Sequence, residues 1–241
     1  MSFYFFERNG NPVEFTAEAF ISAYEKYYFL HDENDSDLIP GVSVNSCVSE
    51  NKIERILSEG ISCREDVNTI LAWKIGGIDH KKSKEEIILK ADWKNIANVR
   101  ERYFKCKSND LDCFCDEIVD IAKNYQSGAT PDNTIKQIAE STKKYNIPLG
   151  PVYILTILYF ITKKESPIFD RFAYTAVKAI YAGVKPKDIW YENPSSKSAE
   201  NVIKVINEYK WFLKQVFGFS QIPRNIDRAL WVYGHQKAIN N

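Results

Sequence analysis

The chain lacks a net charge, because 32 lysine and arginine residues balance 32 aspartate and glutamate residues. No overall field therefore draws it toward nucleic acid or an acidic membrane surface, and a site for a polyanion has to be a local patch. The sequence also lacks a phosphate-binding glycine loop, an HExxH zinc motif and the Ser, His and Asp order of hydrolases. Enzyme classes that depend on those motifs are not expected.

Long hydrophobic runs are absent too. The most apolar stretch, Ile147 to Ile161, is shorter than the ~20 residues that a membrane-spanning helix needs, and it contains Pro148 and Pro151. The first ten residues, MSFYFFERNG, have no basic region followed by a sustained apolar core, so they are not typical of a secretory signal. We expect a buried core helix at this stretch, a cytoplasmic protein and no membrane partner.

Cysteine is present in an odd number, which favours reduced thiols over a disulfide framework. Cys106, Cys113 and Cys115 lie close together in the sequence, but a structural zinc site uses four ligands and no histidine is near them. Buried thiols are therefore favoured over a metal site. We expect neither a metal nor a cofactor. The five cysteines are Cys47, Cys63, Cys106, Cys113 and Cys115.

The residues that are present predict a mainly α globular fold. With 44% hydrophobic and 14% aromatic residues in 241, the chain can bury a large core as one unit over 1–241, or as two packed helical lobes of about 1–130 and 131–241. A short strand is expected at Phe3 to Phe6, and Thr16 is a candidate helix N-cap. Apolar spacing of three and four predicts helices at 16–30, 49–59, 64–75, 109–123, 131–145, 150–162, 170–182, 198–216 and 225–237, with the state of the segment around Trp93 left open.

Asp170 stands at the start of one of these helices, after Ser166-Pro167-Ile168-Phe169. A proline at that place ends the preceding helix, and an acid complements the dipole of the next one. The simplest interpretation is therefore a helix cap. The alternative is that the carboxylate performs chemistry.

The segment Tyr145-Asn-Ile-Pro-Leu-Gly-Pro-Val152 separates two apolar helices. A short turn rich in proline and glycine exposes backbone amides at the start of the following helix, where they can bind a phosphate group. We name as candidate phosphate-binding residues Pro148, Leu149, Gly150, Val152, Lys163 and Lys164.

The order of helix, Pro/Gly hairpin, apolar helix, proline and carboxylate resembles the helix-hairpin-helix DNA glycosylases over roughly residues 135–180. The resemblance implies that fold, double-stranded DNA as the partner, and Asp170 as the carboxylate that stabilises the cationic sugar left when a base is cut out. Two further segments, 70–76 and 224–234, resemble uncharacterised bacterial proteins grouped with oxoguanine-glycosylase folds.

The chain departs from the family pattern in the hairpin and beyond it. Its hairpin, Ile147-Pro148-Leu149-Gly150, has one glycine instead of two, and Pro151 and Val152 occupy the place of the family's nucleophilic lysine. The iron–sulfur cysteine pattern of some members is absent as well. The resemblance thus implies a hydrolytic glycosylase without a lysine lyase step at that place, or a catalytically silent member of the fold that binds nucleic acid or protein.

Two further groups of residues have open interpretations. Lys74, in an otherwise apolar helix, is a candidate second catalytic amine if it is buried near Asp170, although such lysines more often extend to solvent. Arg224 and Arg228 share a helix face and could bind a phosphate, but pairing with acids from another helix is favoured.

The zero net charge also favours a third class, a helical interaction protein with no nucleic-acid role. None of the tryptophans is singled out as a base-stacking wall, and His80 and His235 are assigned no role.

Overall fold

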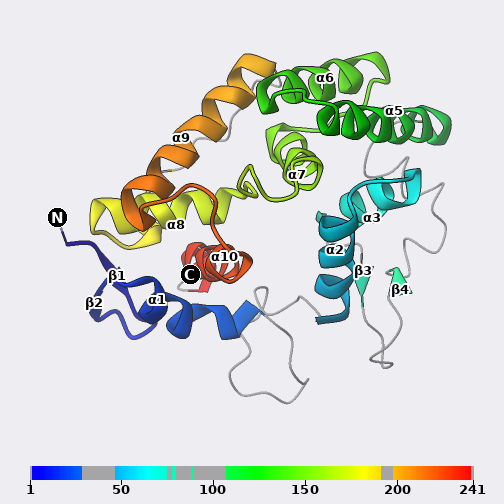
Figure 1. Ribbon diagram of the computed structural model, residues 1–241. Coiled ribbons are helices and arrows are strands. Elements are labelled where there is room, and N and C mark those ends of the chain that lie inside the picture. Colours follow the sequence, from blue (N-terminus) through cyan, green and yellow to red (C-terminus); the bar gives the residue numbers. More distant parts are fainter. Residues whose placement is uncertain are drawn as a thin grey trace. The chain divides into compact units, whose positions relative to one another are not determined.

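The computed structural model describes residues 2–28, 47–74, 78–79, 88–89, 107–190 and 198–239 (Figure 1). Within these ranges the protein is mainly helical, which confirms the predicted fold class. The short N-terminal strand is also confirmed. The segment around Trp93 lies outside the described residues.

The chain forms two compact units, and each is built from segments that are far apart in the sequence. The first unit contains residues Met1–Ser46, Pro167–Asn193 and Ile206–Asn241, and the second contains Cys47–Ser166 and Pro194–Val205. Asp170 therefore belongs to the first unit, whereas the Pro/Gly hairpin and its two helices belong to the second.

The first unit begins with two antiparallel strands, β1 (Tyr4–Phe6) and β2 (Pro12–Glu14). Helix α1 (Ala17–Tyr24) follows, and the Thr16 side chain accepts a hydrogen bond from the Ala19 amide at 3.1 Å, as expected for an N-cap. The predicted helix changes to the 3-10 helix η1 (Glu25–Tyr28) after α1, and residues 29 and 30 lie outside the described residues.

Helices α8 (Arg171–Ala182) and α10 (Arg224–Ile239) pack against each other in the first unit. Their backbones approach so closely at Gly234 that an added Cβ atom would lie 2.0 Å from the carbonyl oxygen of Phe172. A 3-10 turn at Pro186–Asp188 follows α8. Helix α9 (Ala199–Phe217) contributes its residues from Ile206 onward to this unit. Large side chains that are fully buried here include Phe5, Phe20, Tyr24, Phe169, Tyr209 and Tyr233.

The second unit is built around α7 (Pro151–Ile161), which packs against α3 (Arg64–Lys74) and α6 (Pro131–Lys144). Side chains from Ile154 to Ile161 are buried, so the most apolar stretch of the sequence is a core helix, as expected. No helix in the described part of the chain is both long enough and apolar enough to cross a membrane. The described residues of this unit also form α2 (Cys47–Glu59), α5 (Ser108–Gln126), the strand pair β3 (Ile78–Asp79) and β4 (Ile88–Leu89), and the first residues of α9.

We expect Gly234→Ala to lower the free energy of unfolding by about 3 kcal/mol, because the new methyl group would collide with the backbone of α8 at Phe172 and a backbone cannot rotate away. Urea denaturation followed by circular dichroism would measure the change. Gly150→Ser is the matched control, because its φ of −85° is ordinary and no described atom lies within 4 Å of the new Cβ. Equal stability of the two variants would contradict this account of the α8–α10 contact.

Candidate functional site

Asp170 caps helix α8. Its backbone is extended, with φ −137° and ψ 145°, and its Oδ1 atom accepts a hydrogen bond from the Phe172 amide at 2.9 Å. The side chain is half-buried and follows the fully buried Phe169. The helix-cap interpretation is therefore confirmed, and the cap fixes the orientation of the carboxylate.

Aromatic rings gather beside this cap, in the first unit. The Phe172 ring centroid lies 3.4 Å from that of His235 and 6.4 Å from that of Trp231, and the Tyr28 ring lies 5.4 Å from Trp231. We call these four residues the aromatic cluster. The Arg171 guanidinium lies 4.5 Å from the Phe172 ring centroid and adds a positive charge to it.

The sequence interpretation assigned His235 no role, and the structure buries it in this cluster. Its Nδ1 atom lies 2.8 Å from the Trp231 carbonyl oxygen, one helical turn earlier. The four-residue spacing of Trp231 and His235 on α10 was the available signal. Their contact with Phe172 could not be anticipated, because it depends on how α10 packs on α8.

Two arginines of the first unit are engaged in ion pairs. Arg224 pairs with Asp227 and donates from Nη2 to the Tyr28 hydroxyl at 2.9 Å. The Nε atom of Arg228 lies 3.4 Å from a carboxylate oxygen of Glu25. The pairing of Arg228 with an acid of another helix is as expected, whereas Arg224 forms its ion pair with Asp227 of its own helix, α10, one turn along.

Tyr209 brings an unusual hydroxyl group close to the start of α8. Its ring packs against Phe169 at 5.5 Å and Tyr174 at 5.9 Å, measured between centroids. The side chain is fully buried, and its hydroxyl oxygen has no hydrogen-bond partner among the described residues. Burial raises the pKa of this phenol well above its usual value, and the charges of Asp227 and Asp170 raise it further.

The hairpin between α6 and α7 is held by its own backbone and by two buried side chains. Asn146 adopts a left-handed conformation with φ 51°, and the Ile147 amide donates to the Thr142 carbonyl oxygen at 2.8 Å. These features form the Schellman motif that ends many helices. Ile147 and Leu149 are buried and Pro148 between them is exposed, so the hairpin is anchored in the core and presents its proline outward.

Gly150 is the N-cap of α7, and no side chain caps this helix. Pro151 occupies the first helical position, where a missing N–H group costs nothing. The carbonyl oxygen of Gly150 accepts hydrogen bonds from the amides of Tyr153 and Ile154 at 3.0 and 3.2 Å. The contact of Pro148, Leu149, Gly150 and Val152 with a phosphate group at this helix start, which no side chain caps, stays a prediction.

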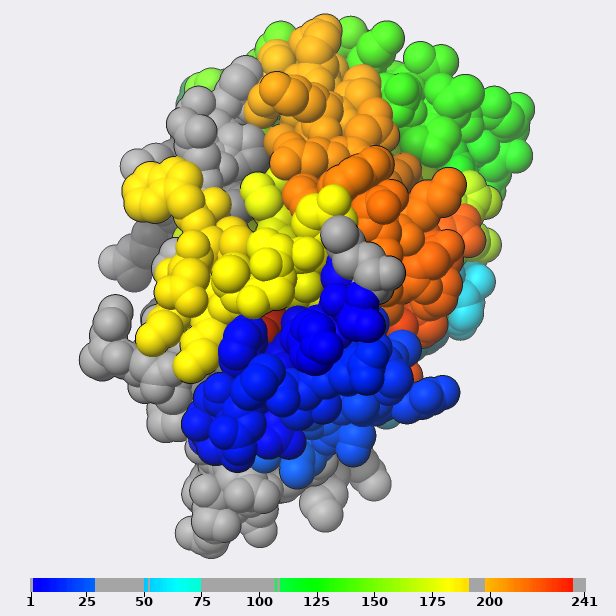
Figure 2. All heavy atoms as spheres, turned by 90° about the vertical axis from the view of Figure 1, so that its left-hand side faces the viewer, coloured from blue at the N-terminus to red at the C-terminus, as the bar shows by residue number. Residues whose placement is uncertain are grey.

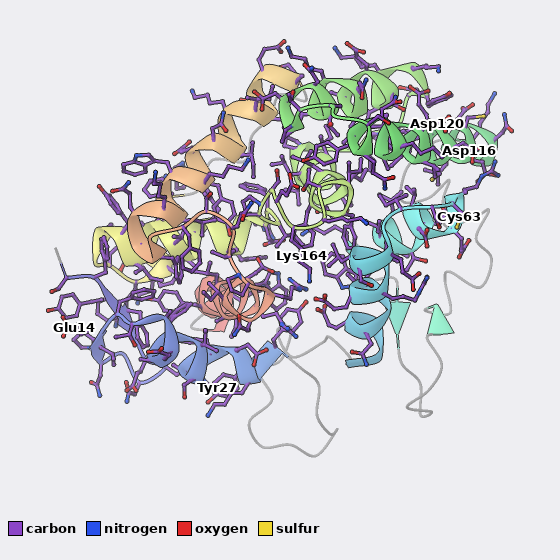
Figure 3. All side chains as sticks on the ribbon, viewed as in Figure 1. Glu14, Tyr27, Cys63, Asp116, Asp120 and Lys164 are labelled. Atoms are coloured by element: carbon purple, nitrogen blue, oxygen red, sulfur yellow. The ribbon has the colours of Figure 1, made fainter. Side chains whose placement is uncertain are left out.

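Lys163 and Lys164 follow the end of α7 with φ values of 47° and 76°, a left-handed conformation that non-glycine residues seldom adopt. Both side chains contact α2, within the same unit. The Nζ atom of Lys164, labelled in Figure 3, lies 2.7 Å from a carboxylate oxygen of Glu54, and that of Lys163 lies 3.5 Å from the Glu59 carbonyl oxygen. Their predicted contact with phosphate stays a prediction, and a phosphate would compete with these partners.

Lys74 is the last residue of α3 and is half-buried. The neighbouring Trp73 donates from Nε1 to a carboxylate oxygen of Glu50 at 3.2 Å. Lys74 lies in the second unit and Asp170 in the first. The role of Lys74 as a second catalytic amine stays a prediction.

Cys63 is exposed, Cys113 is half-buried and Cys115 is buried, and the Cys115 thiol donates to the Asn68 Oδ1 atom at 3.6 Å. Cys106, the other member of the sequence cluster, lies outside the described residues. Within the described ranges, no group of three or more His, Cys, Asp or Glu residues is arranged to hold a metal ion.

Comparison of the chain with protein-family models, with curated proteins and with solved structures found no match in any of the three. The geometry of the chain itself is therefore what supports a function.

We expect Asp170→Ala to destabilise the protein by about 1 kcal/mol, because the Phe172 amide loses its capping oxygen. Asp170→Asn should leave stability nearly unchanged, since asparagine caps helices as well as aspartate does. Thermal unfolding followed by circular dichroism would measure both variants. An asparagine variant as unstable as the alanine variant would show that the charge, and not the cap, is what stabilises α8.

Proposed function

We propose that this protein is DNA glycosylase-like and hydrolyses the N-glycosidic bond of a damaged or mismatched base in double-stranded DNA. The observation that carries the proposal is the succession of α6, a core-anchored hairpin, α7 and a carboxylate at the start of α8. The resemblance to helix-hairpin-helix DNA glycosylases implies this same order of elements. The proposal therefore joins the observed local geometry to the sequence resemblance.

Asp170 would act by electrostatics. Departure of a base leaves positive charge on the sugar, and a fixed carboxylate aimed at the anomeric carbon stabilises the transition state. The same group can orient the attacking water. Its hydrogen bond from the Phe172 amide holds the carboxylate in one orientation before DNA arrives, so little reorganisation is needed during the reaction.

The aromatic cluster supplies surfaces suited to a flipped base. A glycosylase has to take the target nucleotide out of the stack and hold the base between flat or apolar side chains. Phe172 follows Asp170 by two residues, and Trp231 lies within ring-contact distance of Phe172. We assign these two rings to the wall of the base site.

The chemistry would stop at an abasic site. At the place of the family's lysine the chain has Pro151 and Val152, neither of which can form a Schiff base. Water is then the nucleophile, and the sugar–phosphate backbone stays intact until alkali or another enzyme cleaves it. Base removal without strand cleavage would accordingly be the expected outcome.

The alternative is a catalytically silent member of the same fold that binds nucleic acid or protein. A specific observation favours it: the helix cap gives Asp170 a sufficient structural role without any reaction. The two proposals make opposite predictions for a variant that retains the cap and loses the charge.

We expect the protein to release a base from labelled duplexes that each carry one damaged or mismatched base, with strand breaks appearing only after hot alkali. Asp170→Asn should lower the rate at least a hundredfold, because the amide retains the cap and cannot stabilise the cationic sugar. Gel electrophoresis of the alkali-treated strands measures both rates.

The matched control is Asp188→Asn, which removes one acidic charge from the 3-10 turn of the same unit. Product that is lost in Asp170→Asn and retained in the control supports the glycosylase. The catalytic proposal fails if the unaltered protein releases a base from none of the duplexes. It also fails if Asp170→Asn releases the base as fast as the unaltered protein. In either case the silent alternative remains.

Gly150→Asp tests the hairpin by two measurements, thermal stability and duplex affinity, which we expect to respond differently. The new carboxylate would cap α7 and complement its dipole, so the melting temperature should stay equal or rise. If the hairpin binds a DNA phosphate there, the same charge should weaken duplex binding about tenfold and reduce the salt dependence by about one phosphate contact. Fluorescence anisotropy at several salt concentrations would measure the duplex affinity and its salt dependence.

Thr130→Asp is the control for this variant. Thr130 is the N-cap of α6, in the same unit, and its hydroxyl accepts a hydrogen bond from the Asn133 amide. The substitution adds the same charge at a comparable helix start outside the hairpin. An equal loss of DNA affinity in the two variants would reflect the overall charge alone and would remove the hairpin from the proposal.

A further inference from the structure

Exposed aromatic side chains are concentrated in the first unit. Among the described residues, the large hydrophobic side chains with substantial exposure are Tyr4 (42%), Trp190 (83%), Trp211 (47%) and Phe219 (43%), and all four belong to that unit. Single exposed aromatics are ordinary, but several gathered on one surface mark an interaction site. Of these four, Trp211 has the most ring neighbours among the described residues.

Four rings form a continuous series around Trp211. The Trp211 centroid lies 5.3 Å from Tyr181 and 4.9 Å from Phe212, and Tyr181 lies 5.9 Å from Phe3. The series therefore joins the N-terminal segment to α8 and α9, and Figure 2 shows those segments in blue, yellow and orange on one face of this unit. We call Phe3, Tyr181, Trp211 and Phe212 the aromatic surface.

Two lysines lie over rings in this part of the unit. The Lys178 ammonium lies 5.5 Å from the Phe212 centroid and 3.9 Å from a carboxylate oxygen of Glu208, and the Lys185 ammonium lies 5.5 Å from the centroid of Phe6, which is outside the aromatic surface. Residues 178–190 and 208–219, which contribute Tyr181, Trp211 and Phe212, contain five lysines and two acidic residues, a net charge of +3 in a chain whose total is zero. The segments that carry these three rings are therefore basic.

Exposed rings on basic segments are suited to a partner that combines flat bases with phosphates. Aromatic side chains stack on bases of any sequence, and lysines bind the backbone, which is how many proteins hold a single strand. We propose that the aromatic surface binds single-stranded nucleic acid, with a base stacked on Trp211 and phosphates near Lys178 and Lys185. The surface does not include Asp170, so this inference goes beyond the proposed function and holds equally for a catalytically silent protein.

The test measures fluorescence anisotropy of labelled oligothymidylate and oligouridylate with the full chain. Trp211→Leu should weaken binding about tenfold, because leucine retains the apolar contacts with Tyr181 and Phe212 and cannot stack on a base. Trp211→Phe should restore most of the affinity. Phe219→Leu, at a residue of similar exposure outside the aromatic surface, should stay within about twofold of the unaltered protein. A melting curve of each variant checks that it is folded.

Two outcomes would overturn the inference. Equal affinities of Trp211→Leu and the unaltered protein would place the strand elsewhere. Absence of oligonucleotide binding, together with a dimer in sedimentation that Trp211→Leu dissociates, would make this surface an interface between two copies. Because the oligonucleotides carry no damaged base, failure here is separate from failure of base excision, and Asp170→Asn should bind both strands with unchanged affinity.

Discussion

The close approach of α8 and α10 places the aromatic cluster beside the start of α8. Because Gly234 has no side chain, α10 can lie directly against the backbone of α8 at Phe172. That contact lies two residues from Asp170, and it brings Trp231 and His235 next to the Phe172 ring. The contacts of Trp231 and His235 with the Phe172 ring thus depend on one backbone contact that only glycine permits, whereas the Asp170 cap is local to α8.

The same hydrogen bond stabilises the fold and prepares the candidate chemistry. An N-cap carboxylate stabilises a helix, and it is also held in one orientation by the amide that it accepts from. A cap and a catalytic group are therefore compatible functions of Asp170. Because Asp170 can serve as a cap and as a catalytic group, a loss of stability on its removal does not identify its function. Asparagine at this position keeps the cap and removes the charge, so it separates the two roles.

Buried polar groups of the first unit differ in whether they have hydrogen-bond partners. Arg224, Asp227 and Tyr28 satisfy one another, whereas the Tyr209 hydroxyl is buried without a hydrogen-bond partner among the described residues. An unpaired buried hydroxyl costs about 1–3 kcal/mol, so a phenylalanine would suit the fold better unless the hydroxyl has a further use. In the second unit, the left-handed Lys163 and Lys164 likewise occupy a conformation that glycine would adopt at lower cost.

The sequence by itself determined the helical class, most helix ends and the caps at Thr16 and Asp170, because periodicity, prolines and capping residues act within one or two turns. It also indicated that Arg228 pairs with an acid of another helix. Only the tertiary structure decided that His235 contacts Phe172, that Tyr209 is fully buried, and that Tyr181 of α8 contacts both Trp211 and Phe3. Those contacts join residues far apart in the chain, and local spacing carries no information about which helix faces will meet.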